Sequence, residues 1–227
     1  MIGLTASAAT PSLEVGALNG AAAARSRVYQ TFSYLFSYPT SELVTDRYGT
    51  SAAEQVSMAM AALPYALDDE ASELVDLLTS YAGRSDLLAE RYTALFDNCT
   101  GRARVSLREA NHVRQEPRYL WEELVRFYEH FGLDYNLDRT KVWPDHLTVQ
   151  TDLMHYLTFL EAGGADQDVL VRAERDFLSR HLAKWTVDFA ASFALDAEAG
   201  TPVEPFAAFA RLLVAFARAD LDYLNQR

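Results

Sequence analysis

The sequence has few of the residues that stabilise small secreted or loop-rich proteins. Only one of its 227 residues is a cysteine, Cys99, so no internal disulfide can form and a disulfide-stapled secreted fold is excluded. With seven prolines and ten glycines, the chain lacks the turn residues of a loop-rich sandwich. No segment alternates β-branched and polar residues over the length of a strand, so the sequence predicts no β-sheet.

Positive charge is also scarce. The chain has 20 lysines and arginines against 32 aspartates and glutamates, which gives a net charge of −12. The basic residues are scattered, and their densest stretch, 102–118, is interrupted by Glu109 and Glu116. Because such a chain repels phosphate backbones, we expect no nucleic-acid partner. The acidity instead favours a basic partner peptide.

Long apolar runs are missing as well. No segment reaches the roughly 18 apolar residues that a membrane helix requires, so we expect no stable membrane insertion. No lysine or arginine precedes Arg25, so the first residues lack the positively charged start of a signal peptide and contain no twin arginine. We therefore expect residues 1–20 to be a disordered N-terminal tail of a cytoplasmic protein.

What the sequence does have is helical periodicity from residue 21 onward. Apolar residues recur at intervals of three and four, and no linker or repeat divides the chain. The pattern predicts one all-α domain over residues 21–227, built from about eight or more helices. The expected helices span 21–37, 51–63, 68–81, 86–97, 116–131, 144–162, 166–195 and about 201–225.

Capping residues suggest where several of these helices begin or end. Ser85 is a predicted N-cap, and Gly132 is a predicted C-cap. Thr201 and Pro202 resemble an N-cap followed by a first-turn proline. The segments between the helices include two irregular stretches, 98–115 and 134–142. The helix over 166–195 is apolar enough to be the central one.

Residues 143–146 read Trp-Pro-Asp-His and mark another helix start. Pro144 presets the first helical dihedral angle, which would place Asp145 beside free N–H groups of the first turn. His146 titrates near neutrality and can donate or accept a hydrogen bond. A helix start after a long loop is also a common place to hold a ligand, so a simple capping role and a binding role both remain open.

Two pairs of residues have the spacing of metal ligands on one helix face. Glu109 and His112 are three apart, as are Asp152 and His155. Paired motifs of this kind, with further carboxylates, form di-iron sites in four-helix bundles. An alternative function is therefore a carboxylate-bridged di-metal oxidoreductase that uses these four residues. Hydrogen-bonded or solvated polar side chains are the simpler interpretation, because Glu109 and His112 lie in an aperiodic stretch.

Three blocks, taken in order, resemble the TorD/DmsD/NarJ family of cytoplasmic chaperones, which mature molybdenum-containing redox enzymes. The first is ERYTALF at 90–96, similar to the family's E-x-Y-x-x-L-F. The second consists of GL at 132–133, PDHL at 144–147 and DLMHYL at 152–157. The third is FLSRHLAKW at 177–185, similar to F-x-x-x-H-L-x-x-W.

The resemblance is closest to the branch that serves type II enzymes of the DMSO reductase family, such as dimethyl-sulfide and ethylbenzene dehydrogenases and selenate and chlorate reductases. The chain departs from the usual pattern at two positions. Trp143 stands where the family usually has glutamate, and Asp152 stands where it often has glutamate.

The resemblance implies a binding protein and not an enzyme, with no catalytic residue, metal or cofactor of its own. Such chaperones bind the twin-arginine leader of a molybdoenzyme catalytic subunit, assist cofactor insertion and delay export. We expect a monomer in which Asp145 pairs with a leader arginine. A structural adaptor that joins two other proteins is a third possibility. The candidate leader-binding residues are Tyr92, Leu95, Phe96, Glu109, Trp143, Pro144, Asp145 and His146. Of these, Tyr92, Leu95 and Phe96 could equally be ordinary core residues. We expect His181 and Trp185 to pack in the core.

Overall fold

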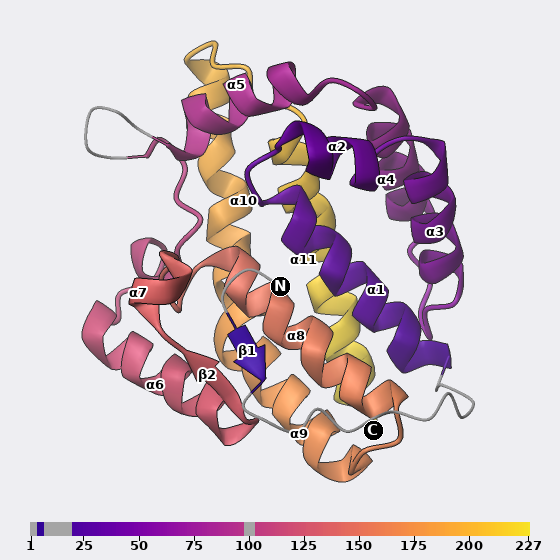
Figure 1. Ribbon diagram of the computed structural model, residues 1–227, viewed down its shortest axis with the longest axis vertical. Coiled ribbons are helices and arrows are strands. Elements are labelled where there is room, and N and C mark those ends of the chain that lie inside the picture. The colour runs from indigo at the N-terminus through magenta and orange to yellow at the C-terminus, as the bar shows by residue number, and fades with distance from the viewer. Residues whose placement is uncertain (1–3, 7–19, 98–102) are drawn as a thin grey trace.

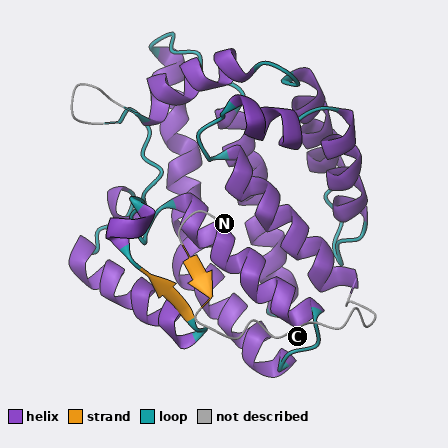
Figure 2. Ribbon diagram, viewed as in Figure 1, coloured by secondary structure: helices purple, strands orange, loops and turns teal. Residues whose placement is uncertain are grey.

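The computed structural model describes residues 4–6, 20–97 and 103–227, which form a helical protein with one two-stranded sheet (Figures 1 and 2). The predicted all-α class is confirmed. No helix in the described ranges is long and apolar enough to cross a membrane. The elements are β1 (Leu4–Ala6), α1 (Gly20–Leu35), α2 (Ser41–Arg47), α3 (Thr50–Ala61), α4 (Asp68–Ser80), α5 (Ser85–Phe96), the 3-10 turn η1 (Glu109–Asn111), α6 (Pro117–His130), β2 (Leu133–Tyr135), α7 (Leu137–Thr140), α8 (Leu147–Ala162), α9 (Gln167–Phe177), the π-helical turn η2 (Leu178–Leu182), α10 (Ala183–Glu198) and α11 (Phe206–Leu224).

Helices α1 and α8 pack along each other at the centre of the molecule, and α11 also contacts α1 (Figure 1). Helix α8 is buried on nearly all sides although it contains several polar residues. Thr151 satisfies its hydroxyl within the helix by donating to the Leu147 carbonyl at 2.9 Å. Gln150 and Glu161 instead pair with side chains of neighbouring segments. Helix α8, not the helix over 166–195, is therefore the central one.

The helix expected over 166–195 is divided by the π-helical turn η2. Asp166 caps the N-terminus of α9 by accepting a hydrogen bond from the Val169 N–H at 3.3 Å. Helix α9 buries only one face. A π-helical turn adds a residue to one turn and changes the direction of the side chains that follow. Periodicity alone does not reveal such a turn, because the apolar pattern continues through it.

Several predicted boundaries are corrected by the structure. Ser85 is the first residue of α5 and does not cap it, since Arg84 occupies the N-cap position. Helix α11 begins at Phe206 and not at 201–202. A residue that precedes a proline rarely adopts helical backbone angles, and Pro205 restricts the backbone of Glu204 in this way. Helix α2 was not predicted because it is short and buries only one residue.

A small antiparallel sheet joins distant parts of the chain. In it β1 pairs with β2, and Thr5 lies opposite Asp134. The strands have three residues each, too few for a period-two pattern to appear in the sequence. The expectation of a tail without regular structure is therefore wrong for residues 4–6. Residues 1–3 and 7–19 of the predicted tail, and Cys99, lie outside the described residues, while Gly20 is the first residue of α1.

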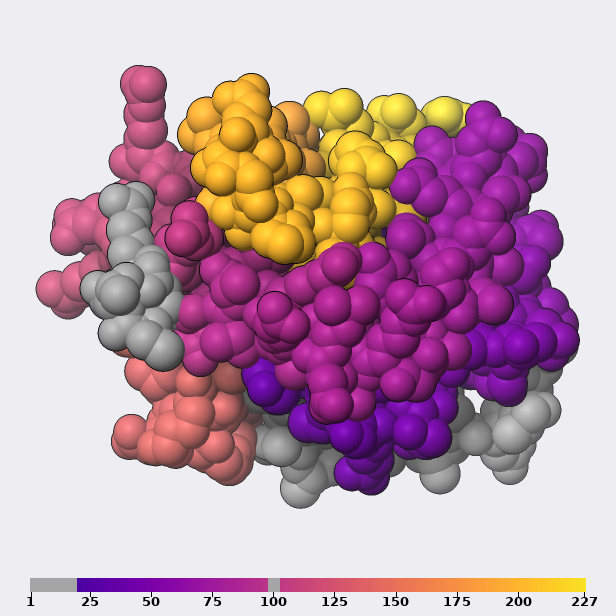
Figure 3. Space-filling model, turned by 90° about the horizontal axis from the view of Figure 1, so that it is seen from above, coloured from indigo at the N-terminus to yellow at the C-terminus, as the bar shows by residue number. Residues whose placement is uncertain are grey.

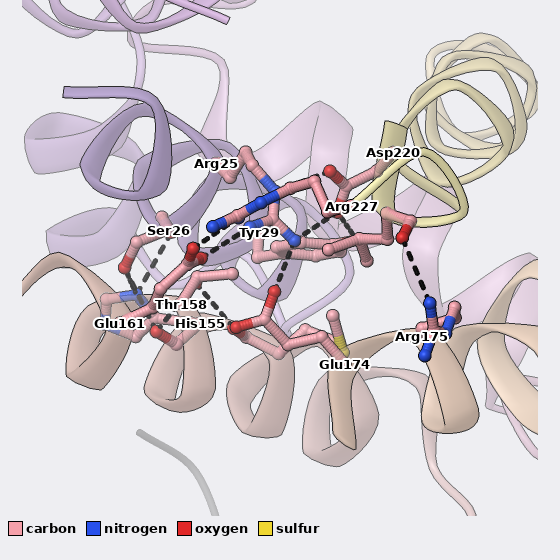
Figure 4. A network of polar contacts seen from close by, with 12 residues as sticks. Arg25, Ser26, Tyr29, His155, Thr158, Glu161, Glu174, Arg175, Asp220 and Arg227 are labelled. Carbon is pink, nitrogen blue, oxygen red and sulfur yellow. Dashed lines mark hydrogen bonds and ion pairs between the residues drawn. The ribbon is translucent and has the colours of Figure 1, made fainter. Parts of the chain in front are cut away.

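A buried ion network connects α1 with α8, α9 and α11 (Figure 4). The Arg25 guanidinium, fully buried, donates to Glu161 at 2.8 Å, to Glu174 at 2.5 Å and to Asp220 at 2.5 Å. At the rim, Arg227 donates to the second oxygen of Glu161 at 2.5 Å. Loss of the Arg25 guanidinium would leave three buried carboxyls without their shared counter-charge, so this network holds four helices in one arrangement.

The network carries one more negative charge than positive charge when all three carboxyls are ionised. Glu174 relieves this excess, because burial and the nearby Glu161 carboxylate raise its pKa to about 7, while Arg25 opposes the shift. One oxygen of Glu174, Oε1, is buried without a hydrogen-bond partner. A proton on Glu174 therefore neutralises the cluster near pH 7.

Candidate functional site

Two loop segments that are distant in sequence run antiparallel beside the start of α8. The Leu147 N–H donates to the Leu107 carbonyl at 2.8 Å, and the Glu109 N–H donates to the Asp145 carbonyl at 3.0 Å. Arg108 and His146 face each other across this short ladder. The structure thus brings together Glu109, Asp145 and His146, which the sequence had suggested separately.

Asp145 is fully buried at this junction. Its Oδ1 accepts a hydrogen bond from Arg108 Nε at 3.2 Å, and its Oδ2 accepts one from the Ala110 N–H at 3.1 Å. Helix α8 begins only at Leu147, so Asp145 does not lie in a helical first turn as predicted. Both of its oxygens are engaged inside the protein, and Asp145 positions the 108–110 segment without offering an oxygen to a partner's arginine.

Arg108 carries the exposed part of this junction, with 25% of its side-chain surface accessible. Its guanidinium carbon lies 4.5 Å from the ring centre of Trp143 and 5.2 Å from that of Trp121. The two indoles are stacked with their centres 4.4 Å apart. We call Arg108, Trp121 and Trp143 the indole corner. A cation held against two indoles forms a rigid, mixed apolar and cationic surface.

The indole corner also contains an unused donor. Trp121 Nε1 is buried and has no hydrogen-bond partner among the described residues. A buried N–H without an acceptor is costly to the folded state. Neither Arg108 nor Trp121 was predicted from the sequence, because their contacts join three separate segments and have no regular spacing.

His146 and Pro144 hold the loop that carries Trp143. His146 is the N-cap of α8, and its Nδ1 accepts from the Thr148 N–H at 3.3 Å. Burial and the nearby Arg108 cation lower the pKa of His146 to about 4, so the ring is neutral at pH 7 and free to accept. The Pro144 carbonyl accepts from the Tyr128 hydroxyl at 2.7 Å. These two contacts fix the loop, and neither requires a partner protein.

Glu109 faces inward. It accepts from Gln150 Nε2 at 2.6 Å and from His181 Nδ1 at 3.1 Å. Gln150 in turn accepts from the Trp185 indole at 2.8 Å. Glu109, His181 and Trp185 are all at least 96% buried, at 2%, 4% and 1% exposure. Glu109 is therefore a buried polar link between η1, α8 and the helix after η2, and His181 and Trp185 pack in the core as expected.

The four residues of the alternative metal site do not form one site. Glu109 bonds within the network just described, and His112 Nε2 donates to a loop carbonyl at 2.8 Å. His155, which would join Asp152, has its Nδ1 2.8 Å from the hydroxyl of Ser26 on α1. The described part of the chain contains no group of three or more histidine, cysteine or carboxylate side chains placed to hold a metal ion.

The remaining candidates lie on α5, apart from the indole corner. Leu95 is fully buried and belongs to the core. Tyr92 and Phe96 are half-buried, with ring centres 4.9 Å apart, and Tyr92 contacts the half-exposed ring of Tyr38 at 5.4 Å. Phe96 packs on the buried Phe206 at 5.1 Å. Tyr92 and Phe96 thus form the edge of an aromatic cluster, and only Tyr38 extends well into solvent.

The loop before α11 lies against α5 at this cluster. Seen from above, the magenta atoms of the α5 region adjoin the gold atoms near residue 200 (Figure 3). Arg91 of α5 donates to the carbonyl of Glu204 in that loop. Burial, aided by the negative charge of Asp97, raises the pKa of Tyr92 to about 12. Tyr92 therefore stays protonated and contributes to packing.

Comparisons with known proteins give a consistent picture. The family model described as "Nitrate reductase delta subunit" matches residues 61–191. The chlorate reductase assembly chaperone protein of Ideonella dechloratans is 38% identical over 112 residues, which are 47% of this chain and 57% of that protein. The selenate reductase assembly chaperone protein of Thauera selenatis is 36% identical over 109 residues, 46% of this chain and 56% of that protein.

A third relative is the dimethyl sulfide dehydrogenase assembly chaperone protein of Rhodovulum sulfidophilum. It is 39% identical over 102 residues, which are 40% of this chain and 41% of that protein. The chain thus matches little more than half the length of the first two relatives and less of the third.

Proposed function

Because the chain belongs to the nitrate reductase delta subunit family, whose model matches more than half of it, we propose that it is an assembly chaperone for the catalytic subunit of a molybdenum-cofactor redox enzyme. The family match confirms the resemblance to the TorD/DmsD/NarJ chaperones that residues 90–96, 144–147 and 177–185 indicated. It also fits the type II branch, since chlorate and selenate reductases and dimethyl sulfide dehydrogenase are named in the relatives. The protein is not an enzyme.

The chaperone acts in the cytoplasm, as a monomer, on the unfolded or cofactor-free catalytic subunit and on its twin-arginine leader. By holding the subunit until its cofactor is inserted, it delays export. The observation that carries this proposal is the match of residues 61–191 to a family whose relatives are assembly chaperones. The net charge of −12 supports it, because an acidic chain attracts a basic leader over long range.

Within this function the indole corner is the contact for the apolar middle of the leader. Trp143 and Trp121 offer flat apolar surfaces, and their stacking holds the two rings together. Asp145, Pro144 and His146 hold the corner in place from beneath, and Glu109 anchors the neighbouring segment. On α5, Tyr92 and Phe96 support the exposed Tyr38, and Leu95 acts only in the core.

The test is capture of partners from the native cytoplasm, with the bound proteins identified by mass spectrometry. We expect an unprocessed molybdoenzyme catalytic subunit, and we expect the mature cofactor-loaded form to bind at least about tenfold more weakly. Equal binding of both forms would instead support the adaptor interpretation. Absence of any molybdoenzyme subunit, under conditions in which a known chaperone of this family captures its own, would overturn the proposal.

A further inference from the structure

The hairpin of α3 and α4 has a groove along its outer face, away from the indole corner. The groove is lined by residues of both helices: Thr50, Ala53, Glu54, Ser57 and Met58 of α3, and Val75 and Thr79 of α4. Met58 is 68% exposed and Val75 is half-buried. In Figure 1 the two helices stand at the right-hand edge of the molecule. We call this surface the α3–α4 groove.

The stretch of sequence that forms α3 and α4 carries only negative charge. Between Arg47 and Arg84 the chain has no lysine, arginine or histidine. The same stretch has six acidic residues, so it carries a charge of −6 out of a net −12, which is half of the excess of the whole chain. The six residues are Glu54, Asp68, Asp69, Glu70, Glu73 and Asp76.

Most of these carboxylates have no internal counter-charge. Among the described residues, Glu73 pairs with Arg211 at 3.0 Å, but no ion pair includes the other five. The dipole of α4 accounts for the three acids in its first turn. It does not account for Glu54, which lines the groove on α3, or for the exposed Asp76, which follows the groove residue Val75 on α4.

Helical spacing extends the groove toward the acidic end of α4. Residues 68, 72, 75 and 79 fall on one face of α4 at intervals of four and three, so Asp68 continues the line of Val75 and Thr79. An apolar strip thus runs into a strongly negative end. A segment that matched it would have apolar side chains in its middle and cationic side chains at one end and along its edge.

We propose that the α3–α4 groove docks a basic amphipathic segment of the client precursor, an apolar stretch with arginines or lysines at one end. This proposal rests on the proposed chaperone function. It assigns the apolar part and the basic part of a client to two different surfaces, because one surface would bind both poorly. The indole corner is cationic at Arg108 and suits the apolar part of a client. The α3–α4 groove supplies the negative charge that a pair of arginines requires. An exposed methionine, flexible and polarisable, allows clients of different sequence to fit.

The test measures binding of the full chain to a short, fluorescently labelled synthetic peptide with a leucine-rich middle and two arginines at one end. Fluorescence anisotropy of the peptide gives the affinity. The double variant Glu54→Lys/Asp76→Lys should weaken binding by about tenfold or more and reduce its dependence on salt. Met58→Asp, at a largely exposed position, should weaken it by about tenfold. A peptide with glutamates in place of the arginines should not bind the parent chain.

Matched controls change the same charge and polarity elsewhere. Asp138→Lys/Glu198→Lys alters two exposed acids that belong to no ion pair among the described residues, and Leu195→Asp alters an apolar side chain that is 74% exposed. These controls should stay within about twofold of the parent. The proposal is overturned if the parent does not bind the arginine peptide, or if groove variants and controls lose affinity equally. The chaperone function is tested separately, because it fails only if no precursor is found in the capture experiment.

Discussion

The Arg108 guanidinium donates from Nε to Oδ1 of Asp145 at 3.2 Å, across 37 positions of sequence. One residue of the pair is partly exposed and the other is fully buried. A carboxylate that looks in the sequence like a ligand for a partner's arginine is therefore already bound to an arginine of its own chain. Its effect on a partner passes through Arg108, which it orients against Trp143.

The first prediction concerns the stability that Asp145 supplies. Asp145→Ala removes the acceptor of both Arg108 and the Ala110 N–H, and should lower the free energy of unfolding by about 2–3 kcal/mol. Asp145→Asn keeps one acceptor oxygen and should lose about half as much. Urea denaturation measures both, and far-UV circular dichroism should show unchanged helical content. An Asp145→Ala chain as stable as the parent would contradict the observed pairing.

The second prediction separates positioning from contact at the indole corner. Trp143→Ala removes one of the stacked indoles and should weaken binding of a captured precursor's leader peptide by about tenfold, with little change in stability. Tyr119→Ala is the matched control, because Tyr119 is an aromatic residue on α6 that is 62% exposed and lies outside the corner. Isothermal calorimetry at one salt concentration gives both affinities. If both variants bind as the parent does, the indole corner is not the leader contact.

The long helices could be predicted from the sequence because they depend on the periodicity of apolar residues. Long helices such as α1, α6 and α8 bury one or more faces, and their apolar residues recur every three or four positions. The sequence did not predict α2 or the sheet of β1 and β2, because short elements contain too few residues to show a period. The π-helical turn η2 was hidden for another reason, since it interrupts the hydrogen bonds while the apolar pattern continues.

Prediction of the candidate site was limited in a similar way. Glu109 and Asp145 were selected from the sequence as candidate leader-binding residues, and that role stays a prediction. Their burial was not predictable, because it depends on the antiparallel pairing of two loops. Arg25 shows the same limit: it is one of two arginines on α1, and nothing in the sequence indicates that three carboxyls from α8, α9 and α11 surround it.

The third prediction concerns Glu174 and the pH dependence of stability. Its pKa is raised to about 7 in the folded protein from an ordinary value of 4.5, so the folded state binds more protons between these values. This group therefore makes stability fall as pH rises through that window, by up to about 1.4 kcal/mol per pH unit. Glu174→Gln removes the effect and should be more stable than the parent at pH 8.

Thermal or urea unfolding of the parent and Glu174→Gln at several pH values from 5 to 8 would measure this difference. Asp168→Asn makes the same kind of change on the exposed part of α9 and serves as the control. The two variants should diverge steadily as pH rises. A Glu174→Gln chain that is less stable than the parent at pH 8 would mean that the carboxylate is ionised and favourably paired in the cluster.

The fourth prediction concerns His146, whose contribution has the opposite sign. Burial and Arg108 lower its pKa from 6.5 to about 4, so the unfolded state binds more protons between these values. The His146 contribution is therefore present above pH 6.5 and is lost as pH falls through 4, where a protonated Nδ1 could no longer accept from Thr148. His146→Asn keeps an N-cap acceptor and removes the titration.

Because the windows of Glu174 and His146 overlap, their opposing slopes partly cancel in the parent between pH 4.5 and 6.5. Each substitution should expose the slope of the other. Stability should rise more steeply with pH in Glu174→Gln than in the parent, and less steeply in His146→Asn, while the double variant should return toward the parent's slope. His112 and His155 also have pKa values lowered by burial, so a rising component should persist in every variant. If His146→Asn leaves the slope unchanged, the ring of His146 is not held neutral by Arg108 and burial, and the N-cap does not titrate with folding.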